Sequence, residues 1–170
     1  GAEVCRFDSI DEASKYIASQ ASGKTLVPDT ELARKHNLTE ALRNADVEVF
    51  EGNFREAGYV PGAGVTFCNF GFADTGTLVL ESTAEEIRLA TTLPEKHFVF
   101  VDPAKILEDN LAGVAPMTAI HQGSEPRFLA YITGPSRTAD IERVLTIGCH
   151  GPRELHLMIV ENLSDDLMEL

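Results

Sequence analysis

The chain has 170 residues, 44% of them hydrophobic, and its 27 acidic residues exceed its 14 basic ones to give a formal net charge of −13. This length and composition suit one α/β domain with its own hydrophobic core. The negative charge argues against nucleic acid and anionic membrane surfaces as partners, because both are themselves negatively charged.

The apolar runs, the N-terminus and the cysteines exclude further classes of protein. No apolar run is long enough to span a bilayer, and no basic-then-apolar signal opens the chain, so we expect a cytoplasmic protein without membrane insertion. The chain starts at Gly1 rather than Met, which predicts that its N-terminal part is incomplete. Cys5, Cys68 and Cys149 lie far apart without a CxxC pair, which argues against a disulfide framework, a zinc ribbon and an iron–sulfur ligand set.

Helices and short strands alternate through the first fifty residues. Ser9 and Glu12 have the spacing of a capping box, and apolar residues at helical spacing follow, so we predict a helix over 9–21. The next predicted elements are a strand over 24–27, a helix from Asp29 or Thr30 to Lys35, a helix from Thr39 to Asn44 and a strand over 47–50.

The middle of the chain contains strands of higher apolar content. Residues 52–64 are predicted as a loop, and residues 65–72 fit either a strand or a short helix. A strand over 77–81 follows, and then a helix that is opened by a capping box at 83–86 and continues to about Ala90. After a strand over 97–101, a helix starts at Asp102-Pro103 and carries Ile106, Leu107 and Leu111. Residues 113–127 are predicted as a loop.

The stretch from Ile132 to His156 is dense in charged, hydroxyl and glycine residues, and predicted strands over 128–132 and 155–160 flank it. Residues 133–138 have the composition of a turn from a strand into a helix capped by Ser136 or Thr138. The predicted helix carries Ile141, Val144 and Leu145 and ends at Gly148. Such a loop, placed after a strand, is where open α/β sheets bind ligands.

This alternation of strands and helices predicts one domain over residues 1–170, with a mainly parallel sheet covered on both faces. The order of the strands does not follow from the pattern.

Two blocks of residues resemble the lactate-utilisation (LUD) domain family, and within it the lactate-utilisation protein C group. One block is GPSRTADIE at 134–142 with GCHGP at 148–152, and the other is ADTGT at 73–77 followed by Arg88, Leu93-Pro94 and His97. The resemblance implies the three-layer α/β/α fold shared by sugar-phosphate isomerases and coenzyme A transferases. It also implies a role in oxidising L-lactate to pyruvate beside partner subunits that carry iron–sulfur clusters. Asp74 stands where the family has glutamate.

Each candidate site residue also has a structural interpretation. Thr75, Gly76 and Thr77 could contact a phosphate or carboxylate, or form a tight turn. Arg137 could bind an anion, or pair with Asp140 or Glu142. The residues expected to bind a small organic acid or a phosphate-bearing ligand are Thr75, Gly76, Thr77, Arg88, Gly134, Ser136, Arg137, Thr138, Asp140, His150, Gly151 and Arg153.

Asp74, Glu142 and His150 are the candidates for proton transfer or other catalysis. His156, inside a predicted strand, is expected to be a hydrogen-bonded histidine of the core or of a sheet edge. A metal site built from His97, His150, His156 and Cys149 would need distant residues to meet, so we expect none.

Three functions remain compatible with these residues. The first is a non-redox subunit of an iron–sulfur L-lactate dehydrogenase complex, with no cofactor in this chain and iron–sulfur clusters in its partner subunits. The second is a stand-alone enzyme acting on a small molecule. The third is a regulatory module that binds an organic acid in a crevice near Thr75 and Arg137.

Overall fold

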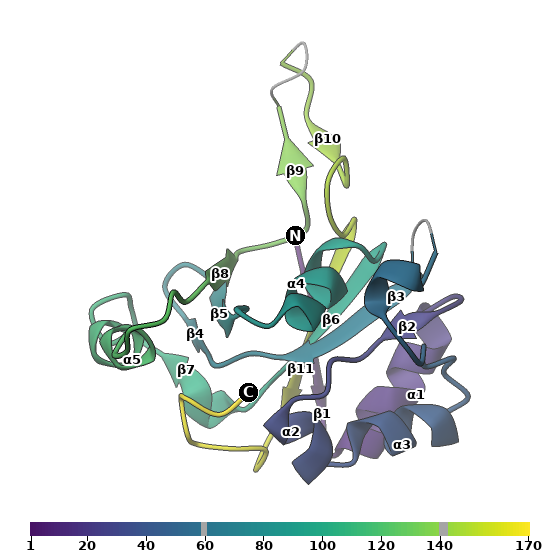
Figure 1. Ribbon diagram of the computed structural model, residues 1–170, viewed down its shortest axis with the longest axis horizontal. Coiled ribbons are helices and arrows are strands. Elements are labelled where there is room, and N and C mark those ends of the chain that lie inside the picture. The colour runs from purple at the N-terminus through teal and green to yellow at the C-terminus, as the bar shows by residue number, and fades with distance from the viewer. Residues whose placement is uncertain (59–60, 140–142) are drawn as a thin grey trace.

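A central parallel sheet organises the protein (Figure 1). The computed structural model describes residues 1–58, 61–139 and 143–170. In spatial order the five strands of this sheet are β1 (Glu3–Phe7), β11 (Glu154–Val160), β6 (Lys96–Val101), β3 (Ala63–Phe67) and β2 (Thr25–Leu26). All neighbouring pairs are parallel. The predicted α/β class with a mainly parallel sheet is therefore confirmed.

Three helices cover one face of this sheet: α1 (Ile10–Gln20), α2 (Glu31–Lys35) and α3 (Leu38–Asn44). The Ser9 hydroxyl accepts a hydrogen bond from the Glu12 N–H at 3.2 Å, which is the cap expected from the sequence. Helix side chains such as Ile17 and Leu42 pack against Phe67 and Phe98 of the sheet. Burial of these apolar surfaces is the main force that holds the helices in place.

The other face is covered by helix α4 (Glu85–Thr92) and by a second sheet. The strands of the second sheet, in spatial order, are β7 (Ile106–Leu107), β4 (Phe70–Phe72), β5 (Thr77–Glu81) and β8 (Leu129–Ile132). Leu78, Leu80 and Ile87 form a second core with Val99 and Val101 on this face. The covering layer on this side is thus part helix and part sheet.

Glycine lets α4 lie close to the central sheet. A Cβ atom placed on Gly64 of β3 would lie 1.9 Å from the backbone oxygen of Ala90 in α4 and 2.9 Å from Cγ of Pro94. A larger residue at this position would therefore push α4 away from the strand.

Several predicted elements are confirmed with small shifts of their ends. These are the helices now seen as α1, α2, α3 and α4 and the strands now seen as β2, β5, β6, β8 and β11. The ambiguous residues 65–72 form strand rather than helix, as the end of β3 and all of β4. The capping box at 83–86 does not form, because the Thr83 hydroxyl accepts a hydrogen bond from the Phe128 N–H at 3.0 Å.

Two predictions after Val101 are wrong. Asp102 begins only the single 3₁₀ turn η2 (Pro103–Lys105), and Ile106 and Leu107 then pair with β4 as strand β7 instead of continuing a helix. The predicted loop over 113–127 contains helix α5 (Val114–Ile120). Pro116 is tolerated there because it lies in the first turn, where its missing N–H would have no helical partner.

The remaining corrections concern the N-terminal half. Residues 47–50 form only an isolated bridge between Val49 and Thr25 instead of a strand. The predicted loop over 52–64 contains the 3₁₀ turn η1 (Phe54–Glu56) and the start of β3. Strand β1 was not predicted, and it lies at the edge of the sheet beside β11.

Candidate functional site

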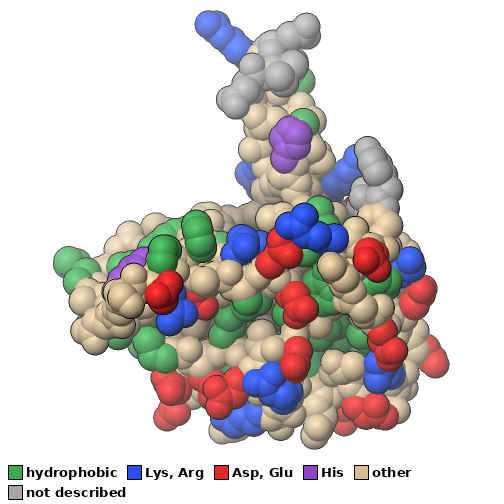
Figure 2. All heavy atoms as spheres, in the orientation of Figure 1, with side chains coloured by type: hydrophobic (Ala, Val, Ile, Leu, Met, Phe, Trp, Pro, Cys, Tyr) green, Lys and Arg blue, Asp and Glu red, His purple; other side chains and the backbone are tan. Residues whose placement is uncertain are grey.

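A projecting β-hairpin, described over residues 133–139 and 143–153, stands where the sequence predicts a helix (Figures 1 and 2). Its strands are β9 (Arg137–Thr138) and β10 (Thr146–Ile147), which pair antiparallel. Asp140, Ile141 and Glu142 lie outside the described residues. Val144 and Leu145 of the predicted apolar stripe are 60% and 63% exposed, so a helix there would have lacked the packing that stabilises short helices.

Ser136 fastens the base of the hairpin. Its hydroxyl donates to the His150 carbonyl at 2.7 Å, its N–H donates to the Pro152 carbonyl at 2.8 Å, and its own carbonyl accepts from the Gly148 N–H at 2.9 Å. Gly151 has φ of +119°, and a Cβ atom there would lie 3.2 Å from the Cβ of Ser136. The Ser136 hydroxyl therefore stabilises the loop. The sequence alone did not distinguish this structural role from a role in ligand binding.

The hairpin base forms one wall of a cavity of about 340 Å³. Five residues predicted to bind a ligand line it: Gly134, Ser136, Arg137, His150 and Gly151. The other described residues of its lining are Thr91, Thr92, His97, Ala130, Tyr131, Ile132, Thr133, Pro135, Pro152 and Leu155. The cavity thus joins the hairpin to the end of α4, the end of β8 and the start of β6 and β11.

His97 is a buried polar residue of this lining, only 1% exposed. Its Nε2 lies 2.9 Å from the hydroxyl oxygen of Thr66, and burial lowers the pKa of His97 to about 3. The imidazole is therefore neutral at physiological pH and offers a hydrogen-bonding group without charge. The sequence placed His97 within the family-like block but did not predict that it lines the site.

The cavity lies at the amino ends of the parallel strands. His97 and Leu155 are the second residues of β6 and β11 and are neighbours in the sheet register. The polar loop does follow the carboxyl end of a strand, as predicted, but that strand is β8 of the second sheet. The helix that the loop was expected to open is absent from the described residues on either side of 140–142.

Arg137 is exposed on β9 and lines the cavity. Among the described residues, none forms an ion pair with it. Pairing with Asp140 or Glu142 concerns residues outside the described ranges. The guanidinium is thus available to a carboxylate or phosphate from the described part of the cavity, with the fork of donors that suits either anion. Thr138 follows on β9 and makes an interaction of its own.

The block at 73–77 lies mostly apart from this cavity. Asp74 and Thr75 are exposed in the turn between β4 and β5, where the Thr75 N–H donates to the Asp74 carboxylate at 2.7 Å. Gly76 and Thr77 line a neighbouring apolar cavity of about 300 Å³. The predicted crevice between Thr75 and Arg137 is therefore corrected: Thr75 is absent from the described lining of the cavity that contains Arg137.

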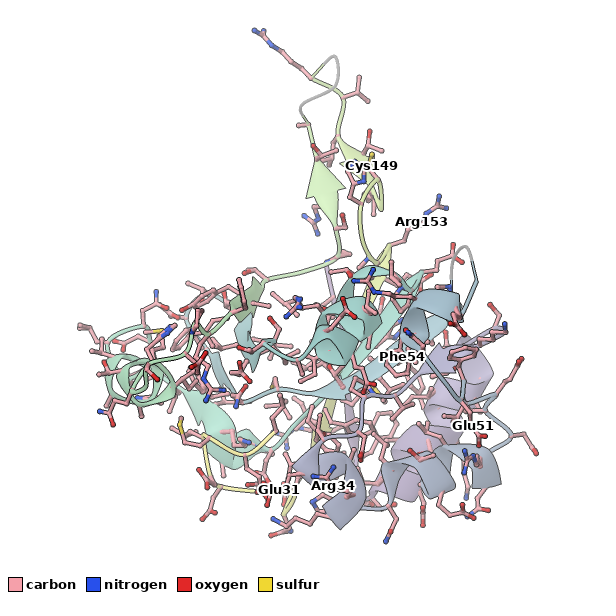
Figure 3. The ribbon with its side chains drawn as sticks, in the orientation of Figure 1. Glu31, Arg34, Glu51, Phe54, Cys149 and Arg153 are labelled. Atoms are coloured by element: carbon pink, nitrogen blue, oxygen red, sulfur yellow. The ribbon has the colours of Figure 1, made fainter. Side chains whose placement is uncertain are left out.

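Two predicted anion-binding arginines have structural partners. Arg88 donates to the carbonyls of Ser82 and Thr83, both at 2.6 Å, and its guanidinium carbon lies 5.4 Å from the centre of the Phe128 ring. Arg153 pairs with Glu95 at 3.7 Å and extends outward below the hairpin (Figure 3). Arg153 thus pairs with a neighbouring acid, whereas Arg88 is held by two main-chain carbonyls and an aromatic ring.

In the part of the chain that the structure describes, the side chains able to bind a metal ion do not converge on one point. Within the described ranges 1–58, 61–139 and 143–170, no three His, Cys, Asp or Glu side chains are grouped as a metal ion would need. Cys68 is fully buried, and burial raises its pKa to about 12, whereas Cys149 is exposed on the hairpin (Figure 3). His156 is a core histidine as predicted, 4.5 Å from the Phe98 ring between centroids.

In the same described ranges, no helix is both long and apolar enough to cross a bilayer.

Comparison with known proteins places the chain among relatives. The LUD domain family model matches residues 1–160. Lactate utilization protein C of Bacillus licheniformis is 35% identical over 165 residues, which covers 89% of this chain and 68% of that protein. Lactate utilization protein C of Anoxybacillus flavithermus is 27% identical over 154 residues, with 88% and 69% covered.

A relative from Neisseria meningitidis, Uncharacterized protein NMB1437, is 37% identical over 98 residues, which cover 58% of this chain. The chain spans only 42% of the length of that protein. Among solved structures, the crystal structure of a DUF162 family protein from Deinococcus radiodurans matches with a TM-score of 0.64 at 20% identity. This match covers 94% of this chain and 88% of that one, and it establishes a shared fold.

Proposed function

The chain belongs to the LUD domain family, and from that membership we propose that it acts in lactate utilisation, as a subunit of a complex that oxidises L-lactate to pyruvate. The observation that carries this proposal is the family match over residues 1–160, together with relatives named Lactate utilization protein C that align along most of the chain. The resemblance seen in two short blocks of sequence thus extends through the N-terminal strands and helices.

In this proposal the redox centres belong to iron–sulfur partner subunits. The sequence contains three cysteines without a CxxC pair, and the structure keeps Cys68 in the core and Cys149 on the hairpin. An iron–sulfur cluster held by protein thiolates needs several cysteines that converge. Electron transfer would therefore run through partner subunits, and this chain would contribute binding or assembly.

The cavity at the hairpin base is the proposed ligand site of this subunit. Arg137 would hold a carboxylate through paired N–H donors. His97, which is neutral, would exchange a hydrogen bond with an uncharged hydroxyl or carbonyl group of the same ligand. These two side chains fit a small organic acid, because such an acid carries one charged end and one uncharged polar group.

The test is affinity purification of the tagged chain from source cells grown on lactate, with absorbance spectra of the eluate. We expect partner subunits with iron–sulfur absorbance and lactate-dependent dye reduction. The Arg137→Ala variant should lose dye reduction but keep its thermal midpoint, because Arg137 is exposed. Arg34→Ala, which removes an exposed arginine that pairs with Asp29 on the far side of the fold, is the matched control.

A colourless eluate that contains this chain alone would contradict the complex. It would instead favour the second candidate, an organic-acid-binding module or stand-alone enzyme, which the 340 Å³ cavity beside Arg137 supports independently. Calorimetric titration of the purified chain with short 2-hydroxy and 2-oxo acids, with Arg137→Ala as the comparison, would then measure that binding directly.

A further inference from the structure

A second cavity, of about 300 Å³, lies beside the cavity that contains Arg137 and His97. The two cavities share three lining residues, which are Ile132, Thr133 and Leu155. Ile132 and Thr133 lie at the end of β8, where the chain enters the hairpin, and Leu155 is the second residue of β11. The polar cavity and the second cavity are therefore neighbours across a boundary of three residues.

The second cavity is almost entirely apolar. Val4, Phe72 and Ile106 are among the side chains that bound it. In its described lining only Thr77 and Thr133 have polar side chains, and their hydroxyl oxygens lie 3.0 Å apart, so each hydroxyl has the other as a hydrogen-bond partner. The described lining contains no charged side chain. Apolar cavities of this kind stay dry and bind apolar ligands.

This apolar cavity forms where the layer that covers the central sheet ends. Over β6, Leu78 of the second sheet belongs to the same core cluster as Val99 and Val101. The central sheet continues past β6 through β11 and β1, where Leu157 and Val4 are neighbours in the register. Leu157 is half-buried and Val4 is 62% exposed, and both line the cavity. Contact with a further apolar group would remove this apolar surface from water, which is favourable.

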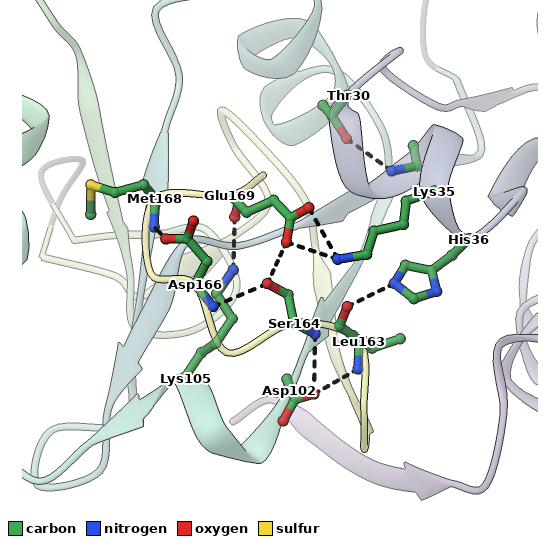
Figure 4. A network of polar contacts seen from close by, with 11 residues as sticks. Thr30, Lys35, His36, Asp102, Lys105, Leu163, Ser164, Asp166, Met168 and Glu169 are labelled. Carbon is green, nitrogen blue, oxygen red and sulfur yellow. Dashed lines mark hydrogen bonds and ion pairs between the residues drawn. The ribbon is translucent and has the colours of Figure 1, made fainter.

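The polar network around Glu169 differs from this cavity in having its partners within the chain (Figure 4). Lys105 Nζ donates to the Glu169 carbonyl at 2.7 Å, and Lys35 Nζ lies 3.1 Å from the Glu169 carboxylate. The Asp102 carboxylate accepts a hydrogen bond from the Leu163 N–H at 2.6 Å. These polar groups stabilise one another, whereas the apolar cavity is open to a further apolar group.

A third cavity, of about 340 Å³, borders the polar cavity on the side of α4 and shares Thr92 and Gly151 with it. This third cavity is lined by the charged residues Glu95 and Arg153, which pair at 3.7 Å. An apolar group placed there would take water away from charged side chains, which is unfavourable. The apolar part of a ligand held in the polar cavity would therefore extend toward the apolar cavity.

We propose that the polar and apolar cavities together bind one ligand, a 2-hydroxy acid with an unbranched apolar chain longer than that of lactate. The inference rests on the proposed function, because it keeps the carboxylate at Arg137 and the 2-hydroxyl group at His97. The apolar chain passes Ile132 and Leu155 into the apolar cavity. Size supports this ligand class, because cavities of about 300–1,000 Å³ hold drug-sized ligands, whereas lactate has only three carbons.

The test is isothermal titration calorimetry of the unchanged chain with lactate, 2-hydroxybutyrate and 2-hydroxyhexanoate. Each CH₂ group that becomes fully buried should tighten binding about fourfold, so 2-hydroxyhexanoate should bind about tenfold or more tightly than lactate. Hexylamine, which has an apolar chain but no acid group, should not bind, because the guanidinium of Arg137 repels its ammonium group.

Val4→Trp and Leu157→Asn test where the apolar chain lies. The first fills the apolar cavity from the exposed edge of β1, and the second makes its wall polar. Each should reduce the gain in affinity from lactate to 2-hydroxyhexanoate and leave lactate binding unchanged. Val114→Trp is the matched control, because Val114 is 53% exposed on α5 and lies outside the described lining of both cavities. Urea midpoints show whether each variant is folded.

Equal affinity for lactate and 2-hydroxyhexanoate would overturn this inference and leave the proposed ligand site standing. A gain with chain length that persists in both Val4→Trp and Leu157→Asn would also overturn it, since the apolar chain would then bind elsewhere, whereas loss of the gain in either folded variant supports it. Arg137→Ala should weaken binding of every acid by the same factor. If none of the acids binds, lactate included, the proposed ligand site and this inference fall together.

Discussion

Acid should destabilise this protein through His97 before its carboxyl groups titrate. In the unfolded chain a histidine takes up a proton near pH 6.5, whereas burial lowers the pKa of His97 in the folded protein to about 3. Between these values the unfolded state binds one more proton than the folded state, so the free energy of unfolding falls as the pH falls. The stabilisation is complete above about pH 6.5 and is lost toward pH 3.

The magnitude follows from the size of the window. Each pH unit below 6.5 costs about 1.4 kcal/mol, so His97 alone should remove about 2 kcal/mol of stability between pH 7.5 and pH 5.0. This interval lies above the ordinary pKa of Asp and Glu, so their contribution is small there. The loss is a large fraction of the stability of a typical domain, which is about 5–15 kcal/mol.

The assay is urea unfolding at pH 7.5 and pH 5.0 for the unchanged chain, His97→Gln and Thr66→Val. His97→Gln should lose about 2 kcal/mol less than the unchanged chain across this interval, whatever its stability at pH 7.5. Thr66→Val should keep the full pH dependence, because desolvation and not the Thr66 hydrogen bond lowers the pKa. Equal pH dependence in the unchanged chain and His97→Gln would refute the reasoning.

Three substitutions test other parts of the fold. Gly64→Ala should lower the free energy of unfolding by about 1–3 kcal/mol or more, because its Cβ would lie 1.9 Å from the Ala90 carbonyl oxygen. An unchanged urea midpoint would mean that α4 does not lie so close to β3. Ser9→Ala should cost about 1 kcal/mol through loss of the α1 cap, again measured by urea unfolding, and Ser9→Asp should recover it. Ser136→Ala should speed amide hydrogen exchange in the hairpin and leave the exchange of β6 amides unchanged, because only the hydrogen bond to the His150 carbonyl is lost. Hairpin exchange rates equal to those of the unchanged chain would show that this hydroxyl does not stabilise the hairpin base.

Much of the central sheet could be predicted from the sequence because its signals are local. Strands such as β6 and β11 are nearly continuous apolar runs, which is the pattern of strands buried on both faces. The cap of α1 requires only residues three apart, Ser9 and Glu12. Ser136, His150 and Gly151 were named as candidate ligand-binding residues, but their mutual contact was not predicted, because a helix was expected between them.

The errors arose where a distant partner outcompetes a local preference. Asp102 looks like the cap of a long helix, but one of its oxygens is taken by Leu163 and Ser164, about sixty residues away. The stripe of Val144 and Leu145 predicts a helix, but no described element offers it a surface. Helix propensity is worth only tenths of a kcal/mol per residue, so packing decides such segments.

The sequence by itself determined the fold class, the family-like blocks and most of the strands, since these depend on composition and on neighbours along the chain. Only the tertiary structure decided that the cavity lies at the amino ends of β6 and β11 and that the neutral His97 lines it. It alone also decided that the buried Lys105 donates a hydrogen bond to the Glu169 carbonyl. The physical reason is that burial and hydrogen-bond partners depend on which residues become neighbours in space. Lys105 and Glu169, 64 positions apart, carry no mark of each other in the sequence.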